Sequence, residues 1–423
     1  MTTAQEILAL FFLWGAGHLL VAGVFSPSKR NWTLFFSTLI LASVYMLKPA
    51  TGDLWSYSFY FDTGYTQVDY DAEARSGIQR ASSIEAGYPV DLVDPLFRSG
   101  MPYLQRYATS PLFAWMTKAS AEFLPHGSKW SRFQADGLRA VSDYFLLEIV
   151  LIGLGLIWFF FQIEKPVTAS GEEKSIQIID WLPLVLGSVY FFVGSQNSIR
   201  QFLMLSALLV LIATLSNKRY ITAIIFGIIT ATFHQFGFLF IIVVLLITFS
   251  QQISSRKFIE KKTARYVAPI LSGLLIGVGG VFCIKVAFAF NIQEIMQYAL
   301  HADSDYPFRT SAGIKWIAIV SVLLTSELIL GRCEEVHLNR YREWRLAAMA
   351  FATPLVIYPE IFSRILFFYF AVEMIFVIFA VYSRSARMRL SGISVFAAYI
   401  VAPNALNLLV GSRWREILVQ SYL

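Results

Sequence analysis

Two arginines lie at the starts of long apolar runs. A membrane helix does not require an arginine at that position. Arg200 opens the run in NSIRQFLMLSALLVLIATLSNKRY, and Arg364 opens the run in FSRILFFYF. Guanidinium groups bind oxyanions through paired hydrogen bonds, so the simplest chemistry for the two is to hold an anionic ligand at a membrane interface. Other polar side chains also flank apolar runs: Asp53, Tyr57, Tyr60 and His234.

The composition indicates an all-α integral membrane protein. The chain has 423 residues, of which 57% are hydrophobic and only 15% are charged, whereas a soluble domain is nearer a quarter charged. Continuous apolar runs predict helices and exclude an outer-membrane barrel, whose strands alternate in hydropathy. The net charge of +6 fits basic anchors in cytoplasmic loops, so no nucleic-acid partner is expected.

Apolar runs long enough to approach or cross the hydrocarbon core recur along most of the chain. They lie near 6–25, 33–48, 140–161, 178–195, 200–216, 219–249, 266–290, 314–331, 345–358, 364–383 and 391–411. The run at 219–249 poses a problem, because basic residues flank it at both ends, at Lys218-Arg219 and in 250–265. Basic loops should be cytoplasmic, so the run is predicted to be a helical hairpin that breaks at FHQFG. This gives about 11–12 transmembrane helices with both termini external.

This topology places Arg200, His234, Arg364 and the stretch after Gly52 on one external face. It also divides the chain into an N-terminal transmembrane hairpin (1–48), a large external loop (49–138) and a transmembrane core (139–423). Within the loop, the segment around 103–123 is either an interfacial amphipathic helix or part of a small packed cap. The shared face is the observation that favours a functional site.

Each candidate also has a purely structural interpretation. Arg200 can extend its charged end towards the interface from a helix end, and His234 can act as a hydrogen-bonded plug in a helix break. Asp53 can cap a turn after Gly52. Arg364 can pair with Glu360 one helical turn earlier. The sequence alone leaves these alternatives open.

Four segments together resemble the EpsG family of Wzy-type polysaccharide polymerases. They are GDLWSYSFYF, NSIRQFLMLSALLVLIATLSNKRY, IITATFHQFGFLF and FSRILFFYFAVEMIF. The most specific part is an Arg-Gln at a span start, followed by a basic turn and then a histidine at the next outer turn. The chain departs from the family in a long aromatic-rich insertion at 61–135, which leaves the location of the acceptor site open.

The resemblance implies a fold like that of the GT-C glycosyltransferases, in the inner membrane of a bacterium. The implied reaction joins undecaprenyl-diphosphate-linked oligosaccharide repeats on the periplasmic face, where a sugar hydroxyl displaces the lipid diphosphate. Arg200 and Arg364 would bind the leaving diphosphate, and His234, or failing that Asp53, would accept the proton of the hydroxyl. The expected glycan-binding residues are Tyr57, Tyr60, Gln201 and Glu360.

No cofactor or metal is expected, and the Asp-Ser-Asp at 303–305 is interpreted as a solvated turn. The expected partners are the lipid-linked donor and acceptor and the membrane lipids, with a chain-length regulator protein as a further candidate. Two rival functions remain: a flippase or transporter of the lipid-linked glycan, and a glycosyltransferase that uses a polyprenyl-monophosphate sugar.

Overall fold

The computed structural model describes most of the helical part of the chain. The described residues are 3–25, 30–47, 152–164, 177–188, 190–191, 194, 199–234, 237–255, 262–289, 306–330, 336–383 and 385–409. The predicted external loop, its helix around 103–123 and the 303–305 turn therefore lie outside the described residues.

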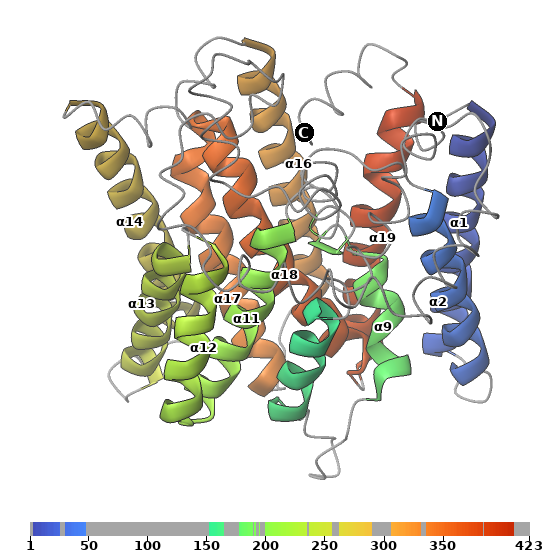
Figure 1. Cartoon of the computed structure of the whole chain (residues 1–423), viewed down its shortest axis with the longest axis horizontal. Helices are drawn as coiled ribbons and strands as arrows, with labels where there is room; N and C mark the ends of the chain where they lie inside the picture. Colours follow the sequence, from blue (N-terminus) through green and yellow to red (C-terminus); the bar gives the residue numbers. More distant parts are fainter. Residues whose placement is uncertain are drawn as a thin grey trace, which may run out of the picture.

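The described residues form a bundle of helices (Figure 1). Its helices are α1 (Thr3–Phe25), α2 (Arg30–Leu47), Ile152–Ile163, α9 (Ile178–Leu186), α11 (Ile199–Ser216), α12 (Tyr220–Phe233), α13 (Gly237–Ser255), α14 (Lys262–Ala289), α16 (Tyr306–Leu330), α17 (Val336–Ala352), the 3-10 turn η3 (Thr353–Ile357), α18 (Pro359–Val381) and α19 (Ala386–Leu409). No strand occurs among these residues.

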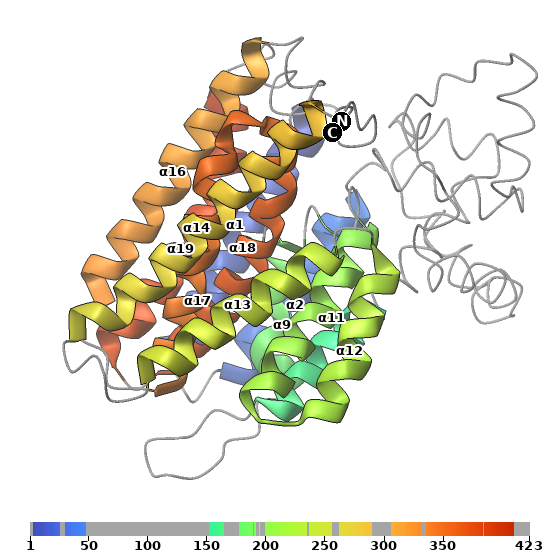
Figure 2. The same cartoon turned by 90° about the vertical axis from the view of Figure 1, so that its left-hand side faces the viewer.

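Helices α11 and α18 are buried along most of their length. In the apolar stretch of α18, 83% of the residues are buried, whereas only 22% are buried in the apolar stretches of α14 and α16. Figure 2 shows α16 at one side of the bundle and α11 and α12 at the other. Every residue of α11 from Gln201 to Thr214 is buried. The burial of these two helices matters because they carry Arg200 and Arg364.

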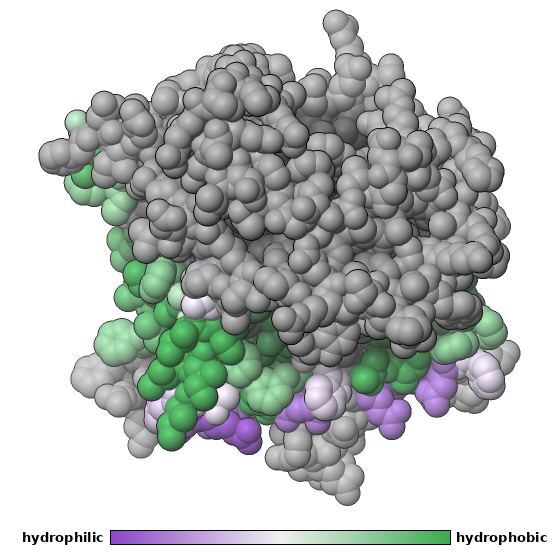
Figure 3. Space-filling view, viewed as in Figure 1, coloured by the Kyte–Doolittle hydropathy of each residue, from purple (hydrophilic) through white to green (hydrophobic). Residues whose placement is uncertain are grey.

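The outer surface of the bundle is apolar, as expected where helices face lipid. Ile221 is 78% exposed, Leu275 is 72% exposed and Leu328 is 83% exposed, which would be unfavourable in water. Figure 3 shows an apolar band on this face, with hydrophilic residues along its lower edge. Three described helices are long and apolar enough to cross a membrane: Val267–Val286, Ala312–Leu330 and Ile361–Val381. The protein is therefore an α-helical membrane protein.

The predicted break in the run at 219–249 is confirmed. Helix α12 ends at Phe233, His234 has an extended backbone (φ −157°, ψ 141°), and α13 begins at Gly237. The N–H of Gly237 donates to the carbonyl of His234 at 2.7 Å. A Cβ on Gly237 would lie 2.4 Å from the carbonyl oxygen of Thr230, so only glycine fits this close approach.

Two glycines allow α14 to pack against the backbone of α17. A Cβ on Gly273 would lie 2.3 Å from the carbonyl oxygen of Ala347, and one on Gly277 would lie 2.5 Å from that of Phe351. Four residues separate the glycines, so both face the same neighbour. Small residues at this spacing let membrane helices approach closely, since lipid gives no hydrophobic drive for their association.

We predict that Gly277→Ala destabilises the protein by about 1–3 kcal/mol, because the added methyl group must push apart two backbones. Gly279→Ala is the matched control on the same helix, because a Cβ there meets nothing within 4 Å. Unfolding midpoints in detergent would report both changes. Equal midpoints for the two variants would show that α14 and α17 do not pack this closely.

Candidate functional site

The candidate site lies at the end of the bundle where α11, α13 and α18 begin and α12 ends. We call this the upper end, because α11, α12 and α13 have their upper ends there in Figure 1, at about the middle height of the molecule. The turn at Lys218, between α11 and α12, lies at the opposite, lower end. Helix N-termini carry partial positive charge from their unpaired N–H groups, so three of them at one end favour an anion there.

A part-buried hydrogen bond joins the first turn of α11 to the second turn of α18. The Nε2 of Gln201 donates to the backbone carbonyl of Arg364, across 163 positions of sequence. The Gln201 side chain is buried, and Arg364 is half-buried. Among the described residues, Oε1 of Gln201 has no hydrogen-bond partner. The two arginine-bearing helix starts that the sequence singled out are therefore neighbours.

His234 is only 4% exposed and caps the C-terminal end of α12. The following helix, α13, packs on α18 through the rings of Phe240 and Phe368, whose centroids are 5.3 Å apart. Phe368 lies one helical turn after Arg364, so α13 reaches α18 close to the turn that carries the arginine. The upper end thus brings together the helix starts that bear Gln201 and Arg364 and the break that bears His234.

The remaining candidates lie outside the described structure. Asp53, Tyr57 and Tyr60 belong to the undescribed stretch between α2 and Ile152–Ile163. Arg200 and Glu360 lie within the first turns of α11 and α18, but their side chains are not described. The predicted pairing of Arg364 with Glu360, the diphosphate grip and the proton-accepting roles all stay predictions.

A buried ionic cluster inside the bundle was missed by the sequence analysis. We call it the Arg345 cluster; its members are Ser326 and Glu327 on α16, Arg342 and Arg345 on α17, and Glu373 on α18. The Arg345 guanidinium lies 2.7 Å from Oε1 of Glu373 and 3.4 Å from Oε1 of Glu327, and it also donates to Ser326. The Nε of Arg342 donates to the second oxygen of Glu327.

The Arg345 cluster is electrically neutral and almost fully removed from solvent. It contains two arginines and two glutamates, and Arg345 is 0% exposed. Its guanidinium also lies 4.0 Å from the ring centroid of Phe376. Buried charges persist only when they are paired, and here the pairing ties α16, α17 and α18 together.

The sequence did carry one signal for this cluster. The expected span at 345–358 begins within α17, which actually starts at Val336 and is followed by η3 from Thr353. The segment VHLNRYREWR, at 336–345, carries too many charges to be predicted as a membrane span from hydropathy. Glu373, however, interrupts the otherwise apolar run of α18, and an acid within a span usually has a buried basic partner.

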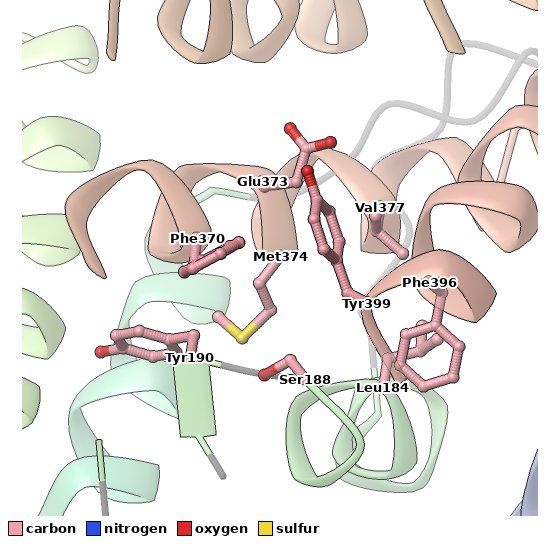
Figure 4. Close-up of a pocket in the computed structure, with 9 residues that line it drawn as sticks. All are labelled: Leu184, Ser188, Tyr190, Phe370, Glu373, Met374, Val377, Phe396 and Tyr399. Atoms are coloured by element: carbon pink, nitrogen blue, oxygen red, sulfur yellow. The ribbon is translucent and has the colours of Figure 1, made fainter. Parts of the chain in front are cut away.

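A small cavity lies beside the Arg345 cluster, between α9, α18 and α19 (Figure 4). Its lining residues are Leu184, Ser188, Tyr190, Phe370, Glu373, Met374, Val377, Phe396 and Tyr399. Figure 4 shows the carboxylate of Glu373 close to the Tyr399 hydroxyl, which lies 2.9 Å from the hydroxyl of Tyr369. The cavity volume is about 20 Å³, room for roughly one water molecule, so it cannot admit a sugar.

Two polar clusters hold the lower end of the bundle. In the first, Arg30 lies 2.7 Å from the carboxylate of Asp180 and 4.6 Å from the ring centroid of Tyr382. The Tyr382 hydroxyl donates to the Asp180 carbonyl.

The second lower cluster joins Ile152–Ile163 to α17 and α11. Arg340 lies 2.9 Å from the carboxylate of Glu164, and Asn217 donates to the same carboxylate at 3.4 Å. The charges of Arg30 and Asp180 thus neutralise each other, and so do those of Arg340 and Glu164. Each pair joins two helical segments, as structural ion pairs do. Among the described residues, no three His, Cys, Asp or Glu side chains gather as a metal site would require.

Comparison with protein-family models, curated proteins and solved structures found no match to this chain. The candidate site therefore rests on its own geometry and on the four segments of the sequence described above.

Proposed function

We propose that the protein is a polysaccharide polymerase that joins polyprenyl-diphosphate-linked oligosaccharide repeats at the upper end of the bundle. The observation that carries the proposal is the Gln201–Arg364 hydrogen bond, which makes neighbours of two helix starts that each bear an arginine. The EpsG-like segments support it, because their most specific residues belong to the same helix ends.

The proposed fold is GT-C-like, with about twelve membrane segments in a bacterial inner membrane and the upper end on the periplasmic side. The lower end would then be cytoplasmic. The exposed Lys218 and Arg219 in the α11–α12 turn agree with that orientation, since basic residues accumulate in cytoplasmic loops. The stretch 49–138 would be a periplasmic loop that contributes Asp53, Tyr57 and Tyr60.

In the proposed reaction, a hydroxyl oxygen of the acceptor glycan attacks the anomeric carbon of the donor. The bond from that carbon to the diphosphate oxygen breaks, and the leaving polyprenyl diphosphate takes the bonding electron pair. Arg200, Arg364 and the three helix N-termini stabilise the negative charge that develops on it. His234 accepts the proton of the attacking hydroxyl, with Asp53 as the second candidate. Glu360 would contact the glycan.

A second candidate function, a flippase or transporter of the lipid-linked glycan, is favoured by the Arg345 cluster. Paired charges within membrane segments occur along substrate and proton pathways of transporters. Such a protein would use the same arginines to bind the diphosphate without breaking a bond. The two functions differ in their product: a polymerase lengthens the glycan and releases free lipid diphosphate, whereas a flippase moves an unchanged substrate.

We predict that Arg200→Lys lowers polymer formation nearly as much as Arg200→Ala, without loss of folded protein. Lysine keeps the positive charge but loses the planar fork that grips two phosphate oxygens at once. Glycan gels from cells that express each variant at matched levels would measure the effect. Near-normal polymer from Arg200→Lys would mean that Arg200 contributes only its positive charge and makes no bidentate hydrogen bonds to the diphosphate.

A further inference from the structure

The amide of Gln201 can lie in only one orientation. A backbone carbonyl only accepts hydrogen bonds, so the atom that faces the carbonyl of Arg364 must be the donor, Nε2. The other atom, Oε1, therefore points elsewhere and has no partner among the described residues. The side chain thus makes one defined bond, and that bond is to the backbone of another helix.

The first turn of α11, which carries Gln201, is itself held firmly. Phe202 is fully buried, and its ring lies 5.2 Å from that of Tyr190 and 5.5 Å from that of Phe191, measured between centroids. The Tyr190 hydroxyl also donates to the Phe202 carbonyl, at 3.2 Å. The backbone of Gln201 is therefore held in place by the packing of Phe202. The Gln201 amide links this fixed turn of α11 to α18 through its bond to the Arg364 carbonyl.

Three of the polar contacts of α18 lie at different levels along its length. At the upper end Gln201 binds the Arg364 carbonyl, in the middle Arg345 binds Glu373, and at the lower end Tyr382 binds the Asp180 carbonyl. Only the first of these contacts acts on the turn that carries Arg364. It joins that turn to the neighbouring turn that carries Arg200.

We infer that Gln201 is a positioning residue: it sets the distance between the Arg200-bearing and Arg364-bearing helix turns, so that both guanidinium groups reach one diphosphate. The inference rests on the proposed function for the identity of the ligand. It assigns Gln201 a role different from the direct glycan contact that the sequence suggested. A misplacement of about 1 Å in a positioning group can cost a factor of roughly a hundred, so the effect should be measurable.

The spacing itself can be measured without any substrate. In a background with Cys283→Ser and Cys333→Ser, cysteines at positions 200 and 364 would be joined by short bifunctional thiol reagents of graded length. Gln201→Met removes the hydrogen bond at similar size, and we expect it to broaden the range of reagent lengths that react and to lower the yield of the shortest. Gln251→Met, on α13, is the control and should leave the pattern unchanged.

The consequence for the ligand would be measured with inorganic pyrophosphate and the full-length protein in detergent. Gln201→Met and Gln201→Glu should each weaken pyrophosphate binding about tenfold or more, while the ligand-free protein stays folded. Glutamate retains an acceptor at the Oε1 position but places a second oxygen against the Arg364 carbonyl. It therefore cannot make the bond that sets the spacing.

Each outcome decides the inference. Unchanged cross-linking and unchanged pyrophosphate binding in Gln201→Met would overturn it. Normal pyrophosphate binding in Gln201→Glu would also overturn it, because that variant cannot donate to the Arg364 carbonyl. If the wild-type protein binds no pyrophosphate, the proposed diphosphate site is wrong, and the cross-linking pattern alone decides whether Gln201 sets the spacing.

Discussion

His234→Gln is expected to lower the rate of polymer formation by about two to four orders of magnitude, the usual worth of general base assistance. Glutamine keeps much of the size and hydrogen-bonding capacity of histidine but cannot take a proton from a hydroxyl. His234 is 4% exposed and caps α12, so a side chain of similar shape should preserve the helix break. Lipid-linked donor should still bind, because the arginines remain.

The matched control is His18→Gln, the same substitution at an exposed position on α1. Polymer would be quantified by glycan gel and folded protein by size-exclusion chromatography, with donor retention measured on the purified variant. Polymer above roughly a tenth of the wild-type rate would move the proton-accepting role to Asp53, given that a general base contributes a hundredfold or more. A variant that fails to fold would support the structural plug instead.

Arg345→Met is expected to cost about 3–5 kcal/mol of stability, because it leaves buried carboxylates without their counter-charge. Arg345 has the most contacts in its cluster, and both Glu373 and Glu327 lose a bond when it is removed. The double variant Arg345→Met with Glu373→Met removes a neutral pair and leaves Arg342 with Glu327. It should recover a large part of the loss.

Unfolding midpoints of the wild type, both single variants and the double variant form a thermodynamic cycle that isolates the pair. Arg387→Met, at an exposed position on α19, controls for the loss of an arginine as such. Additive effects of the two single substitutions would show that Arg345 and Glu373 do not interact. Retention of stability in Arg345→Met alone would mean that the cluster does not hold the three helices together.

The parts of the fold that depend on local chemistry could be predicted from the sequence. The apolar run at 200–216 predicts α11, and the basic residues on both sides of 219–249 predict the break that falls at His234. Gly273 and Gly277 form the small-residue spacing typical of close helix packing, although the sequence does not name α17 as the partner.

The contacts between distant segments could not be predicted in this way. The bond from Gln201 to Arg364 spans 163 positions, and nothing in either segment specifies the other. The start of α17 was missed for a different reason: Arg340 and Arg342 look like loop residues until the carboxylates of Glu164 and Glu327 are brought beside them by packing. Hydropathy records the cost of burying a charge but not the partner that offsets it.

The most direct test of the proposed function is reconstitution of the purified protein with a polyprenyl-diphosphate-linked oligosaccharide. A polymerase yields a ladder of glycans that grow by whole repeats and releases free polyprenyl diphosphate in step with each addition. We expect both products from the wild type and neither from His234→Gln. Transfer of unchanged substrate between the leaflets of a proteoliposome, with no ladder and no free diphosphate, would contradict the account and favour a flippase.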